Sequence, residues 1–565
     1  GARAVAGDPG RRCYAPPLVA RAVADDQAEH AVAPGGSSPR VRLPSWATPV
    51  AVGLAVALGV VLRFVQRSPL WLDEALSVNI ASLPVGDLLE ALRHDGHPPL
   101  YYLLLHYWIE LFGDGDVAVR ALSGVISVAS LPLAGVAGHR LAGATGARWA
   151  VVVTALSPYV VRYATETRMY SLVMLLVLVG YLLVVDALDR PSAPRLAGIW
   201  LVSGLLLLTH YWAFYLVAGV VAALALRAWR DPASRPAALR TGVAVVAGGV
   251  LFLPWLGSFL YQSAHTGTPW GEPFRPTALV QTVLMDLGGG NVTEADLYGT
   301  AVVVLVLVAL FAVRSSGSQL VLDLRTAPTV RLELLVVALV LALGAVAGLA
   351  LDATFQSRYA AVVVPLVLVV AAVGVTRVPG WGRAVVGVVL VGLSLFGLVW
   401  VNYYQRTQSA EVAAAVAERA RPGDVVVYCP DQLGPAYSRE MPDGLVELAY
   451  PTLDGPERVD WVDYAERNAA ADPAAIAAEV RERAAGQAVF LVWMNEYATF
   501  GTQCEDLITE LGGPGEWSRA TGSVLVASLT VTKLRWLADH EPDNAARVAA
   551  VALPDTGWSR AVFVA

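Results

Sequence analysis

Residues 47–74, ATPVAVGLAVALGVVLRFVQRSPLWLDE, place two adjacent carboxylates, Asp73 and Glu74, just beyond an apolar run. The apolar run at 47–66 has the length of a helix that spans a membrane. Two carboxylates at a membrane face are costly unless they have a function. The next polar stretch, HDGHPPL at 94–100, adds two histidines to the same region. We therefore expect a functional site in the loop that follows the first span.

The composition predicts further membrane-spanning segments along most of the chain. Of its 565 residues 56% are hydrophobic and 15% are charged, whereas soluble proteins average about 25% charged residues. Apolar runs recur as far as residue 403, and charges return after 405. We expect a disordered tail at 1–46, a polytopic α-helical membrane domain at 47–405 and a soluble α/β domain at 406–565. The chain has no basic patch with interleaved aromatic residues, which argues against a nucleic-acid partner.

The apolar runs predict eleven spans, and the arginines between them predict their direction. One set of alternate loops contains thirteen arginines, whereas the other set, after the first loop, contains four. By the positive-inside rule the arginine-rich loops and the N-terminal tail are cytoplasmic, and the C-terminal domain is extracytoplasmic. The predicted spans are 47–66, 117–139, 147–161, 169–189, 195–211, 213–229, 239–261, 298–314, 331–351, 358–376 and 383–403.

This orientation decides how the apolar segment 98–112 is interpreted. If it crossed the membrane, every later loop would change sides and the arginine bias would invert. We therefore predict a long first external loop, 67–116, with two juxtamembrane helices at 83–93 and 98–112. The aromatic residues Tyr101, Tyr102, Tyr107 and Trp108 suit an interfacial position.

Four segments between about 45 and 405 resemble the GT-C superfamily of membrane glycosyltransferases, with the protein O-mannosyltransferase and aminoarabinose transferase family as the nearer match. They are Trp71-Leu72-Asp73-Glu74, His97-Pro98-Pro99-Leu100-Tyr101-Tyr102, Ser157-Pro158-Tyr159 through Glu166-Thr167-Arg168-Met169-Tyr170, and Ser357-Arg358-Tyr359. The resemblance implies a GT-C fold and a sugar donor on a polyprenyl monophosphate. It also implies inverting transfer on the outer face, with the first-loop aspartate as base. Ala75-Leu76-Ser77 departs from the aromatic residue that often follows Asp-Glu in the family.

The chemistry of such a transfer assigns roles to particular side chains. Asp73 is the candidate general base, because a carboxylate can take the hydroxyl proton of the acceptor. Arg358 is the candidate phosphate ligand, because a guanidinium binds phosphate oxygens in a bidentate way. Further candidates for substrate or donor binding are Glu74, His94, His97, Arg168, Tyr170, Tyr359 and His210.

Structural alternatives exist for several of these residues. Asp73 and Glu74 would also suit the first turn of a helix, and Arg358 would suit a helix end at the membrane surface. Arg162 and Glu166 are spaced for an ion pair on one helix face. The histidines would also suit a solvated loop. We predict no metal and no cofactor, since Asp114-Gly115-Asp116 fits a helix start better than a metal motif.

The C-terminal domain is predicted from alternating elements, with strands at 424–429 and 488–494 and helices at 411–421 and 473–485. Cys429 and Cys504 either form a disulfide or are two unrelated thiols. Asp460, Asp463 and Glu466 either contact an acceptor or form a solvated face. The domain itself either recognises the acceptor or covers the cavity. A further external loop at 262–297, with His265, Trp270, Glu272 and Asp286, is either a cover that closes over the substrate or an ordinary linker.

Together these observations predict an integral-membrane glycosyltransferase. It would move a sugar, with mannose or arabinofuranose favoured, from a polyprenyl phosphate to a glycan, lipid or protein acceptor of the cell envelope. A transporter or flippase of lipid-linked sugars and a non-catalytic membrane scaffold are the alternatives. The charges gather at the external ends of the predicted spans, whereas a transporter favours ionisable residues near mid-span.

Overall fold

The structure is a computed structural model. It describes residues 44, 46–267, 275–290, 293–316, 319–351, 354–494, 497, 499–512, 550–552 and 560–564. The chain divides into two units, 1–50 and 51–565. The predicted tail at 1–46 lies outside the described residues, apart from 44 and 46. Everything below concerns the second unit, except that helix α1 (Ala47–Leu62) begins in the first.

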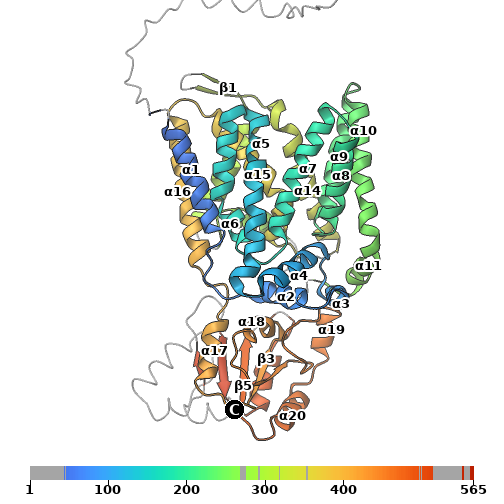
Figure 1. Cartoon of the computed structure of the whole chain (residues 1–565), viewed down its shortest axis with the longest axis vertical. Coiled ribbons are helices and arrows are strands. Elements are labelled where there is room, and N and C mark those ends of the chain that lie inside the picture. The colour runs from blue at the N-terminus through green and yellow to red at the C-terminus, as the bar shows by residue number, and fades with distance from the viewer. Residues whose placement is uncertain are drawn as a thin grey trace, which may run out of the picture. The chain divides into compact units, whose positions relative to one another are not determined.

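Apolar helices make up most of the region from residue 47 to residue 403 (Figure 1). In the described residues seven segments are long and apolar enough to cross a membrane: α5 (Asp116–Leu156), α7 (Tyr170–Asp189), α9 (Ala213–Arg230), Arg235–His265, α13 (Thr293–Phe311), Pro328–Ala350 and α16 (Gly382–Tyr403). Three shorter apolar helices are α1, α8 (Ala193–Leu207) and α15 (Val364–Arg377). The Arg235–His265 segment joins α10 (Arg235–Ala247), the 3-10 helix η2 (Gly248–Trp255) and α11 (Leu256–His265). Pro328–Ala350 joins η3 (Pro328–Val330) and α14 (Arg331–Leu351).

The predicted number of eleven spans is therefore not reproduced as eleven full-length helices. The difference arises in part at α5, which contains two predicted spans. Its backbone leaves the helical region at Ala142 and Gly143. A Cβ on Gly138 would lie 2.5 Å from the carbonyl oxygen of Gly146, so the two arms fold back against each other as a hairpin. Small residues at such a crossing allow two helix backbones to approach closely.

The first loop contains three helices where two were predicted. They are α2 (Leu72–Ala81), α3 (Val85–Asp95) and α4 (Leu100–Phe112), and α2 corresponds to the helix start considered above as the alternative for Asp73 and Glu74. Figure 1 shows the three helices grouped at one end of the long helices, at the opposite end from β1. The predicted helix at 98–112 corresponds to α4, which lies among these short helices as expected. Two short helices, α6 (Pro158–Ala164) and α12 (Pro276–Leu287), and the 3-10 helix η4 (Ser357–Val362) complete this group of connecting elements.

The predicted span at 298–314 extends too far. Helix α13 ends at Phe311, and the chain continues as an antiparallel pair of strands, β1 (Ala312–Ser316) and β2 (Gln319–Leu322). The sequence after 311 contains Arg314 and the polar run Ser-Ser-Gly-Ser, a composition that favours a short hairpin over a membrane interior.

The C-terminal region is a small α/β domain with strand order β4-β3-β5-β7-β6. Strands β3 (Val425–Cys429), β4 (Val446–Ala449) and β5 (Val489–Met494) are parallel, and β7 (Arg560–Val564) pairs antiparallel with both β5 and β6 (Ala550–Ala552). Alternate residues of β3 face opposite layers, so Val426 and Tyr428 join the main core whereas Val425 and Val427 join a second one. The helices are α17 (Ser409–Ala417), α18 (Gly434–Tyr437), α19 (Tyr464–Ala469), α20 (Pro473–Ala484) and α21 (Gln503–Glu510).

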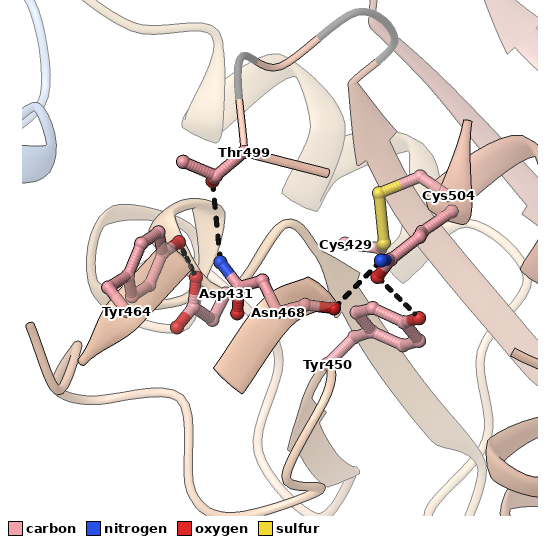
Figure 2. Close-up of a disulfide and its surroundings, with 8 residues drawn as sticks. Cys429, Asp431, Tyr450, Tyr464, Asn468, Thr499 and Cys504 are labelled. Atoms are coloured by element: carbon pink, nitrogen blue, oxygen red, sulfur yellow. Dashed lines mark hydrogen bonds between the residues drawn. A yellow bond between two sulfur atoms is a disulfide. The ribbon is translucent and has the colours of Figure 1, made fainter. Parts of the chain in front are cut away.

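A disulfide between Cys429 and Cys504 joins the end of β3 to α21, which decides between the two alternatives for these cysteines (Figure 2). Beside it, Tyr450 donates a hydrogen bond to Gln503, whose amide donates to the carbonyl oxygen of Asn468. These bonds tie β4, α19 and α21 together around the disulfide.

Candidate active site

Asp73 and Glu74 lie in the first turn of α2, and their side chains enter different environments. Trp71 precedes the helix, and neither carboxylate caps it through a side-chain bond. Glu74 is fully buried, whereas the Asp73 side chain is 17% exposed. Adjacent helical residues are about 100° apart around the axis, so one neighbour can support the loop while the other faces an opening.

Two arginines from distant segments lie next to the carboxylate of Asp73. The Arg358 Nη1 atom is 3.2 Å from Asp73 Oδ2, and the Arg168 Nη2 atom is 3.9 Å from the same oxygen. Arg358 lies in η4, just before α15, and Arg168 lies between α6 and α7. The structure thus brings together three of the predicted site residues, separated by up to 285 positions.

Aromatic side chains line the same region. The Arg358 guanidinium lies 6.0 Å from the ring centroids of both Trp71 and Tyr359. The His210 ring contacts both Tyr359, at 5.4 Å, and Tyr170, at 5.8 Å. Burial first, and then the nearby charges of Arg168 and Arg358, lower the pKa of His210 to about 3. His210 is thus neutral at ordinary pH, and three further predicted residues join the cluster.

Glu74 is bound by protein groups on several sides. Arg120 donates from Nε to Glu74 Oε1 at 2.8 Å and from Nη2 to Oε2 at 2.6 Å, and the Thr167 amide donates to Oε1 at 2.9 Å. Burial alone would raise the pKa of Glu74, but Arg120, Arg406 and Thr167 together hold it below its usual value. We predicted that Glu74 binds substrate. The geometry instead makes it a buried anchor between α2, α5 and the 165–169 turn, because no part of its side chain is exposed.

His97 and Arg168 contact each other directly. Arg168 Nη2 lies 2.8 Å from His97 Nε2, and Nη1 donates to Ser77 Oγ at 3.0 Å and to Tyr102 Oη at 3.2 Å. His97 Nδ1 lies 2.7 Å from Asp95 Oδ2. His97 therefore belongs to the cluster around Asp73 through Arg168.

Comparison with known proteins bears on this cluster. Residues 96–257 match the family model described as dolichyl-phosphate-mannose-protein mannosyltransferase. The match covers 162 of the 565 residues, and over this segment the chain is similar to that glycosyltransferase family. The matched segment contains His97, Arg168, Tyr170 and His210, whereas Asp73 and Arg358 lie on either side of it.

Solved structures support the same assignment of fold. The chain is similar to ArnT from Cupriavidus metallidurans bound to undecaprenyl phosphate, with a TM-score of 0.53 and 13% identity, covering 92% of this chain and 98% of that one. The apo form of ArnT gives the same TM-score and coverage at 14% identity. The predicted resemblance to GT-C glycosyltransferases is confirmed, and the chain is a multi-pass helical membrane protein with an ArnT-like fold.

Curated relatives match only a short stretch. A xylulose kinase from an Actinoplanes species is 63% identical over 49 residues, 9% of this chain and 30% of that protein. A xylulose kinase from Streptomyces coelicolor is 56% identical over 52 residues, 9% of this chain and 11% of that protein. The chain thus spans less than a third of the length of these relatives, and the activity of the whole protein is a matter for proposal.

His94 is not part of the cluster around Asp73. Its Nδ1 atom lies 3.0 Å from Asp460 Oδ1 in the C-terminal domain, and its carbonyl oxygen accepts from the Trp461 amide. Asp463 likewise bonds to His265 at 3.1 Å. The prediction that His94 binds the donor has no support in this geometry. Both aspartates, considered earlier for acceptor contact, instead join the C-terminal domain to α3 and α11.

The expected ion pair between Arg162 and Glu166 is absent from the described contacts. Helix α6 ends at Ala164, so the two side chains do not share a helix face. Arg162 pairs instead with Asp286 of α12 at 2.9 Å. Glu166 is 1% exposed, and burial raises its pKa to about 7 despite the nearby Arg406 and Arg162.

Sequence reasoning missed the partners that hold the cluster in place, which are Asp95, Arg120, Asp286 and Arg406. The available signal was position, since Asp95 lies inside the HDGHPPL segment and Asp286 inside the 262–297 loop, both already singled out. Trp270 and Glu272 of the predicted cover lie outside the described residues. Within the described ranges no three metal-ligating side chains gather, and the expectation of no metal stays a prediction.

Proposed function

We propose that the protein transfers a sugar from a polyprenyl monophosphate to an acceptor hydroxyl, with Asp73 as general base. One observation carries this proposal. A partly exposed carboxylate, Asp73, lies 3.2 Å from Arg358, which is a cation suited to phosphate, inside a cluster of aromatic side chains. Such a constellation offers a base and a phosphate ligand at one place.

In the reaction the acceptor oxygen attacks the anomeric carbon while Asp73 takes its hydroxyl proton. The bond between the anomeric carbon and the phosphate oxygen breaks, and the polyprenyl phosphate leaves with the electron pair. One displacement of this kind inverts the anomeric configuration. Arg358, and Arg168 beside it, would stabilise the negative charge that grows on the phosphate. In the structure without donor, Arg358 pairs with Asp73; on donor binding the phosphate would become its partner.

The donor class rests on the family description and on the fold. The family description names dolichyl-phosphate-mannose as donor, and ArnT, whose fold is similar, was solved with undecaprenyl phosphate. We therefore favour a polyprenyl phosphate that carries mannose or arabinofuranose. We place acceptor and site on the extracytoplasmic side, with eleven spans, because the arginine bias assigns the loop of Asp73 to that side. The acceptor would be an envelope glycan, lipid or protein.

A transfer assay tests the proposal. The purified protein is given a panel of polyprenyl-phosphate sugars with membrane extract as acceptor, and products are identified by mass. We expect transfer by the wild type and a loss of at least about 100-fold in kcat for Asp73→Asn, because general-base catalysis typically contributes 100- to 10,000-fold. The matched control is Asp87→Asn, an exposed aspartate in the first turn of α3, which should retain wild-type activity.

Two results would contradict the proposal. If the wild type moves intact lipid-linked sugars between leaflets without transferring them, the protein is a flippase. If Asp73→Asn transfers sugar at the wild-type rate, the reaction uses another base.

A further inference from the structure

The hydrogen bonds around His97 determine which of its ring nitrogens carries the proton. A guanidinium can only donate hydrogen bonds. Because Arg168 Nη2 lies 2.8 Å from His97 Nε2, this nitrogen must accept and carries no hydrogen. The remaining ring nitrogen, Nδ1, then carries the proton of the neutral ring and donates it to Asp95 Oδ2 at 2.7 Å. The geometry thus assigns one tautomer to His97.

Asp95 is built to receive that bond. Its side chain is 2% exposed, and Tyr102 donates to the same carboxylate oxygen at 3.1 Å. Burial alone would raise the pKa of Asp95, but the hydrogen bonds from His97 and Tyr102 and the positive charge of Arg168 lower it below its usual value. A carboxylate that stays ionised in a buried place can hold an imidazole in one orientation and one tautomer.

The backbone between Asp95 and His97 holds these side chains in place. Helix α3 ends at Asp95, and Gly96 follows with a φ of +84°, which a residue with a side chain rarely adopts. A Cβ at Gly96 would also lie 3.2 Å from Thr266 Oγ1. Pro98 then restricts His97 to an extended conformation. The turn therefore presents both side chains to Arg168.

We propose that Asp95 and His97 form a positioning dyad that holds Arg168 against Asp73. Neither residue of the dyad needs to touch the substrate. His97 Nε2 anchors the same Arg168 nitrogen that lies 3.9 Å from Asp73 Oδ2, so the dyad sets where this positive charge meets the base and the donor phosphate. This revises the role predicted for His97, from donor ligand to orienting residue, and it assigns a role to Asp95. Only the kinetic test of this inference depends on the proposed function.

The kinetic test compares two replacements of His97. The amide of Gln reaches the place of Nε2 and can still accept from Arg168, whereas the amide of Asn reaches only the place of Nδ1. We expect His97→Gln to keep most of the wild-type kcat/KM for the donor, and His97→Asn and Asp95→Asn each to lose about 10- to 100-fold. The KM of the acceptor should not change. The matched control is His106→Asn, because the buried His106 of α4 bonds to the Ala81 carbonyl oxygen through Nδ1, the position that the Asn amide reaches, and should tolerate the change.

A second test does not depend on activity. In an NMR spectrum of the protein with ¹⁵N-labelled histidine, the His97 signal is identified by its disappearance in His97→Gln. In the wild type this signal should show a neutral ring protonated at Nδ1. The same signal should lose this single tautomer in Asp95→Asn. If Asp95→Asn does not fold, the His97→Gln and His97→Asn pair still decides the kinetic question.

The outcomes separate this inference from the proposed function. If the wild type transfers no sugar while the spectrum shows the expected tautomer, the proposed function fails and the dyad stands as a structural feature. An Nε2-protonated or charged His97 would overturn the dyad. Equal activity of His97→Asn and the wild type, in a protein that transfers sugar, would overturn it too.

Discussion

At the scale of single residues, the Asp73-Glu74 pair shows how two identical functional groups acquire different tasks. The pair shares one helical turn, but Glu74 turns inward to Arg120 and Asp73 turns towards Arg358. The buried ion pair between Glu74 and Arg120 links α2 to α5. Asp73, which is partly exposed, remains available for chemistry. This division could not be predicted from the sequence, because the partner of Glu74 lies 46 residues away.

Breaking the buried pair should therefore affect stability strongly. In Arg120→Leu the Glu74 carboxylate would stay buried without its main partner, and we expect a loss of about 3–5 kcal/mol in the free energy of unfolding. Thermal unfolding in detergent measures the effect. Arg240→Leu, at an exposed position of α10, is the control and should change stability by less than about 0.5 kcal/mol. Equal midpoints for the two variants would contradict a structural role of the pair.

Glu166 should make stability fall as the pH rises. Its pKa is raised from 4.5 to about 7 in the folded protein, so the folded state holds a proton that the unfolded state releases. The resulting stability is present below pH 4.5 and is lost as the pH rises through 7. For a buried group this corresponds to roughly 3 kcal/mol.

Unfolding midpoints at pH 5 and pH 8 measure this effect. We expect the wild type to lose more stability over this interval than Glu166→Gln, whose side chain does not titrate. Asp431, whose burial also raises its pKa to about 7, acts in both proteins and cancels in the comparison. The same loss in the wild type and in Glu166→Gln would exclude Glu166 as the cause.

At the scale of elements, the sequence predicted the apolar helices and the parallel strands of the C-terminal domain well, because each has a continuous local pattern. The helix at 98–112 was found because the arginine bias excludes a crossing there. Helix α2 was foreseen only as the alternative in which Asp73 and Glu74 begin a helix, because ten residues of mixed polarity, LDEALSVNIA, have no clear helical period. The ion pair of Arg162 was misplaced because α6 ends two residues before Glu166, and Asp286 comes from a helix 124 residues away.

The hairpin of α5 offers a test of packing between its arms. In Gly138→Ala the new Cβ would lie 2.5 Å from both Gly146 O and Ala150 Cβ. Because both arms would have to move apart, we expect a loss of about 1–3 kcal/mol. Gly53→Ala in α1 is the matched control, since a Cβ there meets nothing within 4 Å. The control should gain up to about 1 kcal/mol from helix propensity, and a gain of that size at Gly138 would contradict the close approach.

At the scale of the whole molecule, the proposed orientation can be tested by labelling. Arg230, at the end of α9, belongs to the arginine-rich loops that we place in the cytoplasm. In a protein with Cys13→Ser, a cysteine introduced by Arg230→Cys should react with a membrane-impermeant maleimide only after the cells are opened. A cysteine introduced by Asp87→Cys, in the first loop, should react in intact cells. The reverse pattern would overturn the orientation.

The connection between the helical bundle and the C-terminal domain has one more consequence. Arg406, just after α16, donates to the Thr165 carbonyl oxygen and to Thr165 Oγ1, both at 2.8 Å, and its amide donates to Ser68 Oγ. Arg406, in the segment that joins α16 to the C-terminal domain, thus holds the turns at Ser68 and Thr165, on either side of Glu74. A shortened protein that ends at residue 405 would lose a cation from beside the loop that contains Asp73 and Glu74, as well as the domain beyond it. A chimera between homologues, or a helical bundle expressed without the C-terminal domain, should therefore keep Arg406 with the bundle.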